Sequence, residues 1–139
     1  MSAVMNGSAG TARARVLFVD DEPRILITLK ALFRNEYDVV TANSGAEAVE
    51  KLRVQAFDVI VSDQRMPQMT GVELLRTASS LCPRAVRLLL TGYADLNAII
   101  GSINEGEIFR FVSKPWMNEE LRGTLAAAVR ASKVEGSSG

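Results

Sequence analysis

Two residue types that supply much of enzyme chemistry are scarce or missing in this sequence. Among its 139 residues there is no histidine, and Cys82 is the single cysteine. The lack of histidine excludes a Ser-His-Asp triad and zinc sites built from cysteine and histidine together. One cysteine cannot form a disulfide within the chain, so we expect a reducing compartment, the cytoplasm.

An excess of charge of either sign is missing as well. Lys+Arg and Asp+Glu number 16 each, which gives a formal net charge of zero. Proteins that bind nucleic acid usually carry a basic excess or stripe, so we expect no direct contact with nucleic acid. No apolar run approaches the roughly 18 residues of a membrane span, so we expect no association with a membrane either.

The composition that remains is typical of a globular domain. Hydrophobic residues make up 47% of the chain and charged residues 23%, and a chain of this length can bury one core. The first residues are rich in glycine, serine and alanine. We therefore predict a disordered leader over residues 1–12, one folded domain over 13–133, and a linker or cloning-derived tail over 134–139.

Five short apolar runs alternate with segments of helical period. Runs that are apolar throughout, rather than at every second position, are typical of strands covered on both faces. Helices between such strands imply right-handed crossovers and a parallel sheet. We predict an α/β fold, a flavodoxin-like three-layer sandwich whose five-stranded parallel sheet has the order 2-1-3-4-5. The predicted strands cover residues 16–19, 37–42, 57–61, 86–90 and 108–112.

The segments between the strands carry helix signals and one weak point. Pro23 suits the first turn of a helix, and Ser44 with Glu47 three residues later is a capping-box pattern. The helix predicted over residues 94–105 contains Gly101, and a glycine there costs roughly 1 kcal/mol relative to alanine. We expect this helix to be the least stable of the domain.

Four of the five predicted strands lead into polar residues that a core does not require. They are Asp20 and Asp21 after the first strand, Asp63 after the third, Thr91 after the fourth and Lys114 after the fifth. Each of them alone is typical of a turn. In a parallel sheet, however, the carboxyl ends of the strands share one edge, and ligands bind there. That edge would gather three carboxylates, a hydroxyl and an ammonium group.

This combination suits the transfer of an anionic group with the help of a divalent cation. Three neighbouring carboxylates repel one another unless one takes up a proton or a cation lies between them. Oxygen ligands suit Mg²⁺, which binds through one or two carboxylates and phosphate oxygens. A carboxylate can also act as a phosphoryl nucleophile. The charge of a transferred phosphoryl group needs a cation and donors, which Lys114 and Thr91 would provide.

The same residues resemble a known family. In order and spacing, four segments resemble the signature segments of receiver domains of bacterial two-component response regulators, and the likeness covers nearly the whole predicted domain. Each segment alone is moderately specific, and together they are very specific. The segments are residues 17–23, 62–67 followed by Gly71, 90–92 and 113–116.

The resemblance implies a regulatory domain rather than an enzyme. Asp63 would accept a phosphoryl group from the phosphohistidine of a sensor histidine kinase or from a phosphotransfer protein. Mg²⁺, for which Mn²⁺ or Ca²⁺ could substitute, would be bound directly by Asp21 and through water by Asp20. Asp63 and the backbone carbonyl of Arg65 would complete the protein ligands. The domain would assist its own phosphorylation and dephosphorylation, and any enzymatic output would lie in another domain.

The resemblance also implies a switch. Lys114 would pair with the phosphoryl group, and the peptide bond before Pro115 is expected to be cis. Thr91 would move to bond a phosphoryl oxygen, and Phe111 stands at the place of the switching aromatic residue. Because Phe111 lacks the hydroxyl of the commoner tyrosine, it would act by packing. The surface made by residues 94–105, 108–112 and the last helix would then control an output domain, a partner protein or a second copy.

Three narrower interpretations of the sequence can be compared. Residues 62–67, 91–95 and 104–108 resemble receivers attached to HD-GYP phosphodiesterases. A first alternative is a pseudo-receiver, a protein-interaction module that is never phosphorylated, although such modules usually lack part of the acidic set or the lysine. A second is a phosphatase of the haloacid-dehalogenase type, whose D-x-D pattern on the first strand is here Asp20 followed by Glu22.

Overall fold

Strands and helices alternate along the chain. The computed structural model describes residues 13–104 and 106–138, so the predicted leader over residues 1–12 lies outside the described residues. The strands are β1 (Arg15–Val19), β2 (Asp38–Ala42), β3 (Val59–Asp63), β4 (Val86–Thr91) and β5 (Arg110–Ser113). The helices are α2 (Pro23–Phe33), α3 (Gly45–Val54), α4 (Gly71–Leu81), α5 (Tyr93–Ile99), the 3₁₀ turn η2 (Ile100–Ser102) and α6 (Asn118–Ser138).

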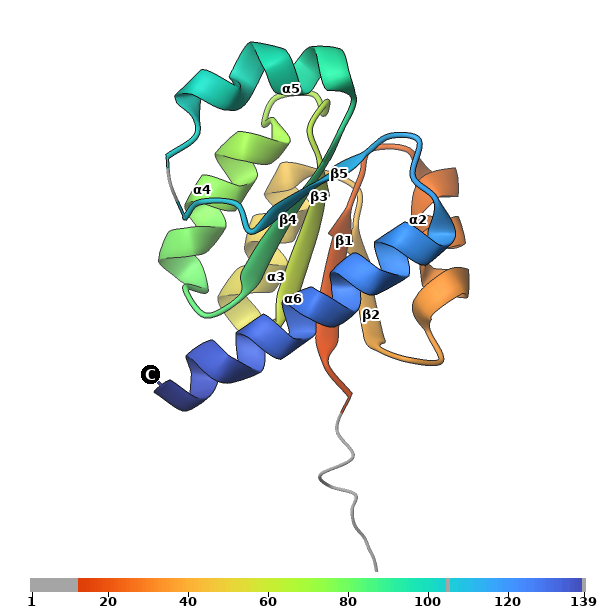
Figure 1. The fold of residues 1–139 in the computed structure, drawn as a ribbon, viewed down its shortest axis with the longest axis vertical. Coiled ribbons are helices and arrows are strands. Elements are labelled where there is room, and N and C mark those ends of the chain that lie inside the picture. The colour runs from red at the N-terminus through yellow and green to blue at the C-terminus, as the bar shows by residue number, and fades with distance from the viewer. Residues whose placement is uncertain (1–12, 105, 139) are drawn as a thin grey trace, which may run out of the picture.

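The five strands form one parallel sheet in the order β2-β1-β3-β4-β5 (Figure 1). This confirms the predicted flavodoxin-like order. In such a sheet the strand order reverses between β1 and β3, and the crevice at that point opens at the carboxyl ends of the strands.

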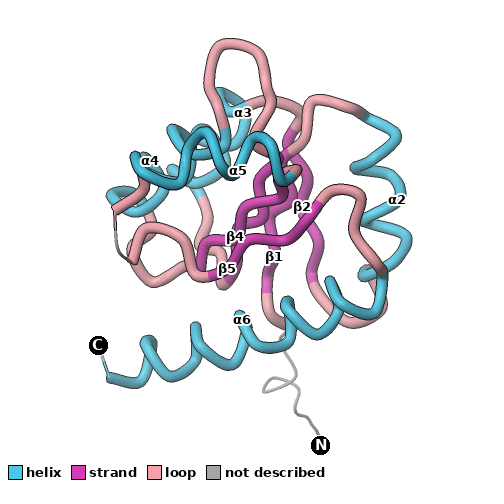
Figure 2. Tube along the Cα trace, turned by 45° about the horizontal axis from the view of Figure 1, so that its top comes forward, coloured by secondary structure: helices cyan, strands magenta, loops and turns pink. Residues whose placement is uncertain are grey.

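Helices cover both faces of the sheet because successive side chains of a strand point to opposite faces. Val16 and Phe18 of β1 belong to the core cluster that α2 and α6 complete. Leu17 and Val19 belong to a second cluster, which α3 and α4 complete. Figure 2 shows α6 on one side of the strands and α3 and α4 on the other. The central strands are therefore buried on both faces, which explains why they are apolar nearly throughout.

Two predicted strands are displaced by about one to two residues. β3 covers Val59–Asp63 rather than 57–61, and β5 covers Arg110–Ser113 rather than 108–112. A strand extends only where a neighbour lies alongside it, and the β1–β3 and β3–β4 pairings both begin at Val59. Apolar character alone could not place that register.

The helix predicted over residues 94–105 is shorter than expected. α5 begins at Tyr93 and ends at Ile99, and η2 follows it. The change to a tighter turn coincides with Gly101 and Ser102, which are poor helix formers. The Ser102 hydroxyl donates to the carbonyl oxygen of Ile99 at 2.8 Å, which satisfies a carbonyl at the helix end. Residue 105 lies outside the described residues.

The last helix runs from Asn118 to Ser138 and so enters the segment for which a linker or tail is predicted. Among the helices of residues 13–104 and 106–138, none is both long and apolar enough to span a membrane.

Candidate functional site

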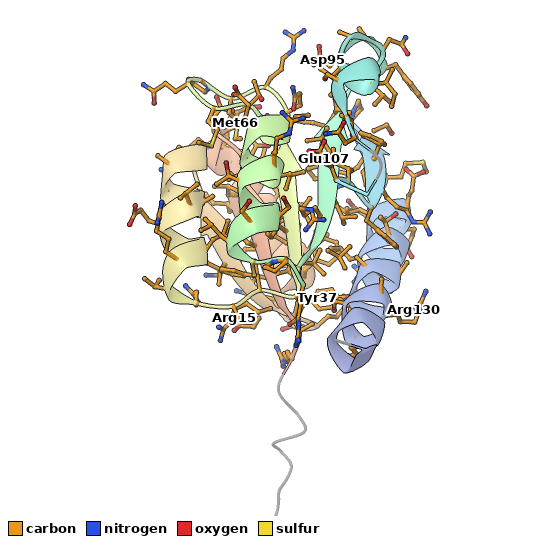
Figure 3. The ribbon with its side chains drawn as sticks, turned by 90° about the vertical axis from the view of Figure 1, so that its left-hand side faces the viewer. Arg15, Tyr37, Met66, Asp95, Glu107 and Arg130 are labelled. Atoms are coloured by element: carbon orange, nitrogen blue, oxygen red, sulfur yellow. The ribbon has the colours of Figure 1, made fainter. Side chains whose placement is uncertain are left out.

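The parallel register brings the predicted site residues to one edge of the sheet. Val19 of β1 pairs with Ser62 of β3, so the residues that follow them, Asp20 and Asp63, are neighbours. Asp63 ends β3 and Thr91 ends the adjacent β4. Figure 3 shows Asp95 and Met66 at this end of the molecule and Arg15 and Tyr37 at the other.

Three carboxylates form the centre of the site. Asp20, Asp21 and Asp63 each offer an oxygen, and these oxygens lie within 4.8 Å of one another. Asp20 is fully buried and Asp63 is 5% exposed, whereas Asp21 is exposed. Burial raises the pKa of Asp20, and the nearby charge of Asp63 raises it further, although a bond from the Glu22 amide opposes both. The site therefore holds more negative charge than its surroundings favour.

Lys114 is the cation of the site. Its Nζ donates to Asp63 Oδ1 at 2.8 Å and lies 3.5 Å from Asp20 Oδ2. Burial acts to lower the pKa of this ammonium, but the hydrogen bond and charge of Asp63, together with Asp20, raise it above its usual value. Burial also raises the pKa of Asp63, and the bond from Lys114 opposes that rise only in part. One lysine does not balance three carboxylates.

An unsatisfied oxygen marks where a cation would fit. Asp20 Oδ1 accepts the Glu22 amide at 2.9 Å, whereas Asp20 Oδ2 is buried without a hydrogen-bond partner in the described part of the chain. The Lys114 ammonium lies 3.5 Å from this oxygen, and a buried carboxylate oxygen that accepts no hydrogen bond is costly. Three clustered carboxylates with one such oxygen suit a hard divalent cation such as Mg²⁺. The residues present therefore fit the ion.

The loop after β3 is held tightly beneath Asp63. The Gly71 amide donates to the Gln64 carbonyl at 3.0 Å, and the Val72 amide donates to Gln64 Oε1 at 2.9 Å. Thr70 and Glu73 form a reciprocal capping box at the start of α4. This cap was not predicted, although Thr70 followed three residues later by Glu73 is its usual signal in a sequence.

The remaining predicted residues lie around the same edge. The Thr91 hydroxyl is buried and donates to the Gly92 carbonyl at a long 3.4 Å. Phe111 lies one strand away and packs, half-buried, against the cluster under α3 and α4. The peptide bond between Lys114 and Pro115 is cis.

An open pocket of about 420 Å³ lies over the acidic cluster. Besides the predicted Asp21, Asp63, Arg65, Thr91 and Lys114, its lining includes residues that the sequence analysis did not assign to it. These are Glu22, Gln64, Gly92 and Asp95. Glu22 and Gln64 could have been found as neighbours of predicted residues, whereas only the fold brings in Asp95.

Asp95 binds Arg65 across the mouth of this pocket. Arg65 Nε and Nη2 donate to the two carboxylate oxygens of Asp95 at 2.7 Å and 2.6 Å. The hydrogen bond from Arg65 holds the pKa of Asp95 below its usual value, and Asp95 raises the pKa of Arg65 in return.

Comparison with known sequences identifies relatives for most of the chain. Residues 16–126 match the sequence model of the family described as the response regulator receiver domain. The hydrogenase transcriptional regulatory protein HoxA of Cupriavidus necator is 40% identical over 124 residues, which are 89% of this chain and 26% of HoxA. The transcriptional regulatory protein ZraR of Escherichia coli is 33% identical over 115 residues, or 82% of this chain and 26% of ZraR. The chain thus spans about a quarter of the length of these relatives.

Solved structures share the fold over nearly the whole domain. The signal receiver domain of an HD domain-containing protein from Pseudomonas fluorescens has a TM-score of 0.85 and 35% identity, with 96% of this chain and 98% of that chain covered. An adenylate cyclase structure from Rhodopirellula baltica has a TM-score of 0.86 and 35% identity, with 91% and 94% covered. The response regulator TrrA of Thermotoga maritima, solved with Mg²⁺-BeF, has a TM-score of 0.73 and 29% identity, with 83% and 98% covered.

Proposed function

The chain belongs to the response regulator receiver family, and from that premise we propose that Asp63 accepts a phosphoryl group from a phosphohistidine. The family consists of regulatory domains of two-component systems, which interact with histidine kinases and output domains. The donor here would be a sensor histidine kinase or a phosphotransfer protein. The observation that carries the proposal is the 2.8 Å hydrogen bond between Lys114 and Asp63 inside a cluster of three carboxylates.

In the proposed reaction a carboxylate oxygen of Asp63 attacks the phosphorus atom. A P–O bond forms while the P–N bond of the phosphohistidine breaks, and its electron pair returns to the imidazole nitrogen. Lys114, already beside Asp63, offsets charge on the phosphoryl oxygens. The Thr91 hydroxyl makes only a long bond of 3.4 Å to the Gly92 carbonyl, so it can turn to donate to one of those oxygens.

We propose that the acidic cluster binds Mg²⁺, with Mn²⁺ or Ca²⁺ able to substitute. Asp21 and Asp63 would be direct ligands, Asp20 would act through water, and the carbonyl of Arg65 would complete the protein ligands. When bound, the ion supplies positive charge to the carboxylates and to the phosphoryl oxygens. The buried Asp20 Oδ2, which accepts no hydrogen bond, and the raised pKa values of Asp20 and Asp63 support this assignment.

We propose that phosphorylation changes the surface formed by α5, β5 and α6. Only Gly92 separates Thr91 from the start of α5. A rotation of the Thr91 side chain toward the phosphoryl group would therefore shift the start of that helix. Phe111 would respond by packing, since it carries no hydroxyl. Tyr93, Ile100 and Phe109 of this region are 77%, 51% and 40% exposed. Such exposed apolar side chains suit contact with an output domain, a partner protein or a second copy.

The two alternatives are less well supported. A pseudo-receiver would not need the complete set of acidic residues with Lys114. The similar proteins described above include no phosphatase of the haloacid-dehalogenase type. As a receiver that takes its phosphoryl group from a kinase and has a single free cysteine, the protein would act in the cytoplasm. An HD-domain output is one candidate, because the receiver of an HD domain-containing protein is among the similar structures.

Intact-mass measurement after incubation with acetyl phosphate and Mg²⁺ tests the proposal. The wild type should gain the mass of one phosphoryl group and Asp63→Asn should gain none. Asp38→Asn is the matched control, because Asp38 is an exposed aspartate at the opposite end of the sheet, and it should behave as the wild type does. Labelling of Asp63→Asn at another residue would overturn the assignment.

A further inference from the structure

Helix α5 has little packing to hold it against the domain. None of its 7 residues is buried, its N-cap Gly92 makes no side-chain cap, and η2 replaces its last turn. Ile99 packs only partly against the core. A short helix of this kind depends on tertiary contacts for its stability. Polar ties from neighbouring segments therefore matter more for α5 than for a well-packed helix.

Two arginines bind the two ends of the segment made by α5 and η2. One arginine lies in the loop after β3 and the other in α4. Arg65, two residues after Asp63, binds Asp95 in the first turn of α5 with two hydrogen bonds. Arg76 of α4 donates to the carbonyl of Ser102 at 3.2 Å and forms an ion pair with Glu107 at 2.8 Å. The Arg65–Asp95 tie begins two residues after Asp63, beside the proposed phosphorylation site. The tie made by Arg76 begins on α4 instead.

The Arg65–Asp95 pair lies where two hollows meet. Both residues line the pocket over the acidic cluster, and both also line a neighbouring hollow of about 440 Å³. Met66 and Ala98 are among the other residues of that second hollow. Arg65 therefore borders the space that a group on Asp63 would enter, while its guanidinium holds α5 through Asp95.

A phosphoryl group on Asp63 would change which partner Arg65 favours. Phosphorylation replaces a singly charged carboxylate by a group of nearly two negative charges with three acceptor oxygens. Asp20 and Asp21 remain, so even with a divalent cation and Lys114 present the negative charge exceeds the positive. Arg65 is the further cation that lines this pocket.

We propose that the Arg65–Asp95 pair is a latch that phosphorylation of Asp63 opens. In the unphosphorylated protein the pair holds the first turn of α5 to the loop after β3. In the phosphorylated protein Arg65 binds the phosphoryl oxygens, Asp95 is released and α5 moves more freely. This inference rests on the proposed phosphorylation of Asp63 and adds a second route to α5, separate from Thr91.

The exchange of partners is possible because the present pair, although bidentate, lies at the surface. The Arg65 side chain is 80% exposed and that of Asp95 is 23% exposed, and ion pairs at the surface are screened by water and salt. A phosphoryl group in a partly enclosed pocket is a stronger partner, because it carries more negative charge than the Asp95 carboxylate and a guanidinium can also bind its oxygens with two parallel hydrogen bonds.

Hydrogen exchange of the backbone amides in α5 tests the latch. The samples are wild type, Arg65→Gln, Asp95→Asn and the control Arg53→Gln, each with and without Mg²⁺ and beryllofluoride as the phosphoryl mimic. Arg53 is an exposed arginine of α3 that has no ion pair or side-chain hydrogen bond within the described residues. Without the mimic, the first two variants should exchange roughly two- to fivefold faster in α5 than the wild type, and Arg53→Gln should not differ from it.

With the mimic, the wild type should reach the faster exchange of the two latch variants, and those variants should change little further, because the same tie is already broken. Exchange in α5 that stays unchanged or slows in the wild type overturns the latch, as do latch variants that match the wild type without the mimic. Intact mass with acetyl phosphate separates the two levels: a wild type that is phosphorylated but keeps α5 protected refutes the latch alone. A wild type that takes no phosphoryl group refutes the proposed function and the latch with it.

Discussion

Gly71, the first residue of α4, packs against the backbone that carries Asp63, and its replacement by alanine tests how tightly the site is built. A Cβ atom at this position would lie 2.4 Å from the carbonyl oxygen of Asp63 and 2.7 Å from Leu89 Cδ1. Leu89 could turn away, but the backbone oxygen of Asp63 is held within β3. Backbone would have to move by at least 0.6 Å to bring the contact to 3.0 Å.

The expected cost follows from this forced movement. Adding a methyl group to a well-packed site typically costs about 1–3 kcal/mol. For a domain of this size, 1 kcal/mol lowers the melting temperature by about 4 °C, so Gly71→Ala should melt about 4–12 °C below the wild type. Because the carbonyl that must move belongs to the phosphoacceptor, the initial rate of phosphorylation should fall as well. A misplacement near 1 Å can reduce a rate by about 100-fold.

Gly123 is the matched control, since it is an exposed glycine inside α6, and a Cβ atom added there would have no neighbour within 4 Å. Gly123→Ala should stabilise the protein by up to about 1 kcal/mol through helix propensity alone and leave phosphorylation unchanged. The same substitution should thus have opposite signs at the two positions. Thermal melts followed by circular dichroism measure the stability, and acetyl phosphate labelling measures the rate. A Gly71→Ala protein that melts and reacts as the wild type does would refute the reasoning.

Two further predictions concern the charge of the site. Mg²⁺ at about 100 times its dissociation constant should raise the free energy of unfolding by about 2.7 kcal/mol and so raise the melting temperature. Asp21→Ala should abolish this rise, whereas the control Asp38→Ala should keep it. An undiminished rise in Asp21→Ala would place the ion elsewhere. Burial raises the pKa of Asp63 above its ordinary value of 3.8, so its contribution to stability is complete below that value and is lost as the pH rises through the higher folded pKa. Asp63→Asn should therefore gain stability relative to the wild type as the pH rises above about 4 in Mg²⁺-free urea melts, and a difference that stays constant with pH would contradict this.

Much of the fold could be predicted from the sequence, because the relevant signals are local. Apolar runs separated by helical periods indicate a parallel sheet covered on both faces, and the structure confirms the predicted strand order. The ends of the elements were predicted less well. β3 ends two residues later than predicted, because pairing with β1 and β4 sets its register, and α5 ends at Ile99 because its apolar contacts do not offset the poor helix formers that follow.

The capping box predicted at Ser44 and Glu47 is another feature that the sequence predicted only in part. Ser44 does accept the Glu47 amide at 3.0 Å, as the capping-box pattern predicts. The Glu47 carboxylate, however, accepts the amide of Asn43 rather than that of Ser44. The complete box is at Thr70 and Glu73 instead, where it shapes the loop beside Asp63. Side-chain direction at a helix start depends on how the preceding chain approaches, which a spacing rule does not contain.

The sequence by itself determined which chemical groups are available: three aspartates, a threonine and a lysine at strand ends, and no histidine to compete with them. The tertiary structure alone decided how those groups are paired and which oxygen is left over. Lys114 reaches Asp63 across 51 positions of sequence, and Arg65 reaches Asp95 across 30. Such contacts arise because parallel strands are joined by crossovers that return each carboxyl end to the same edge of the sheet. Distances of a few ångströms at that edge depend on the register of the strands and the packing of the helices, and these are properties of the whole fold.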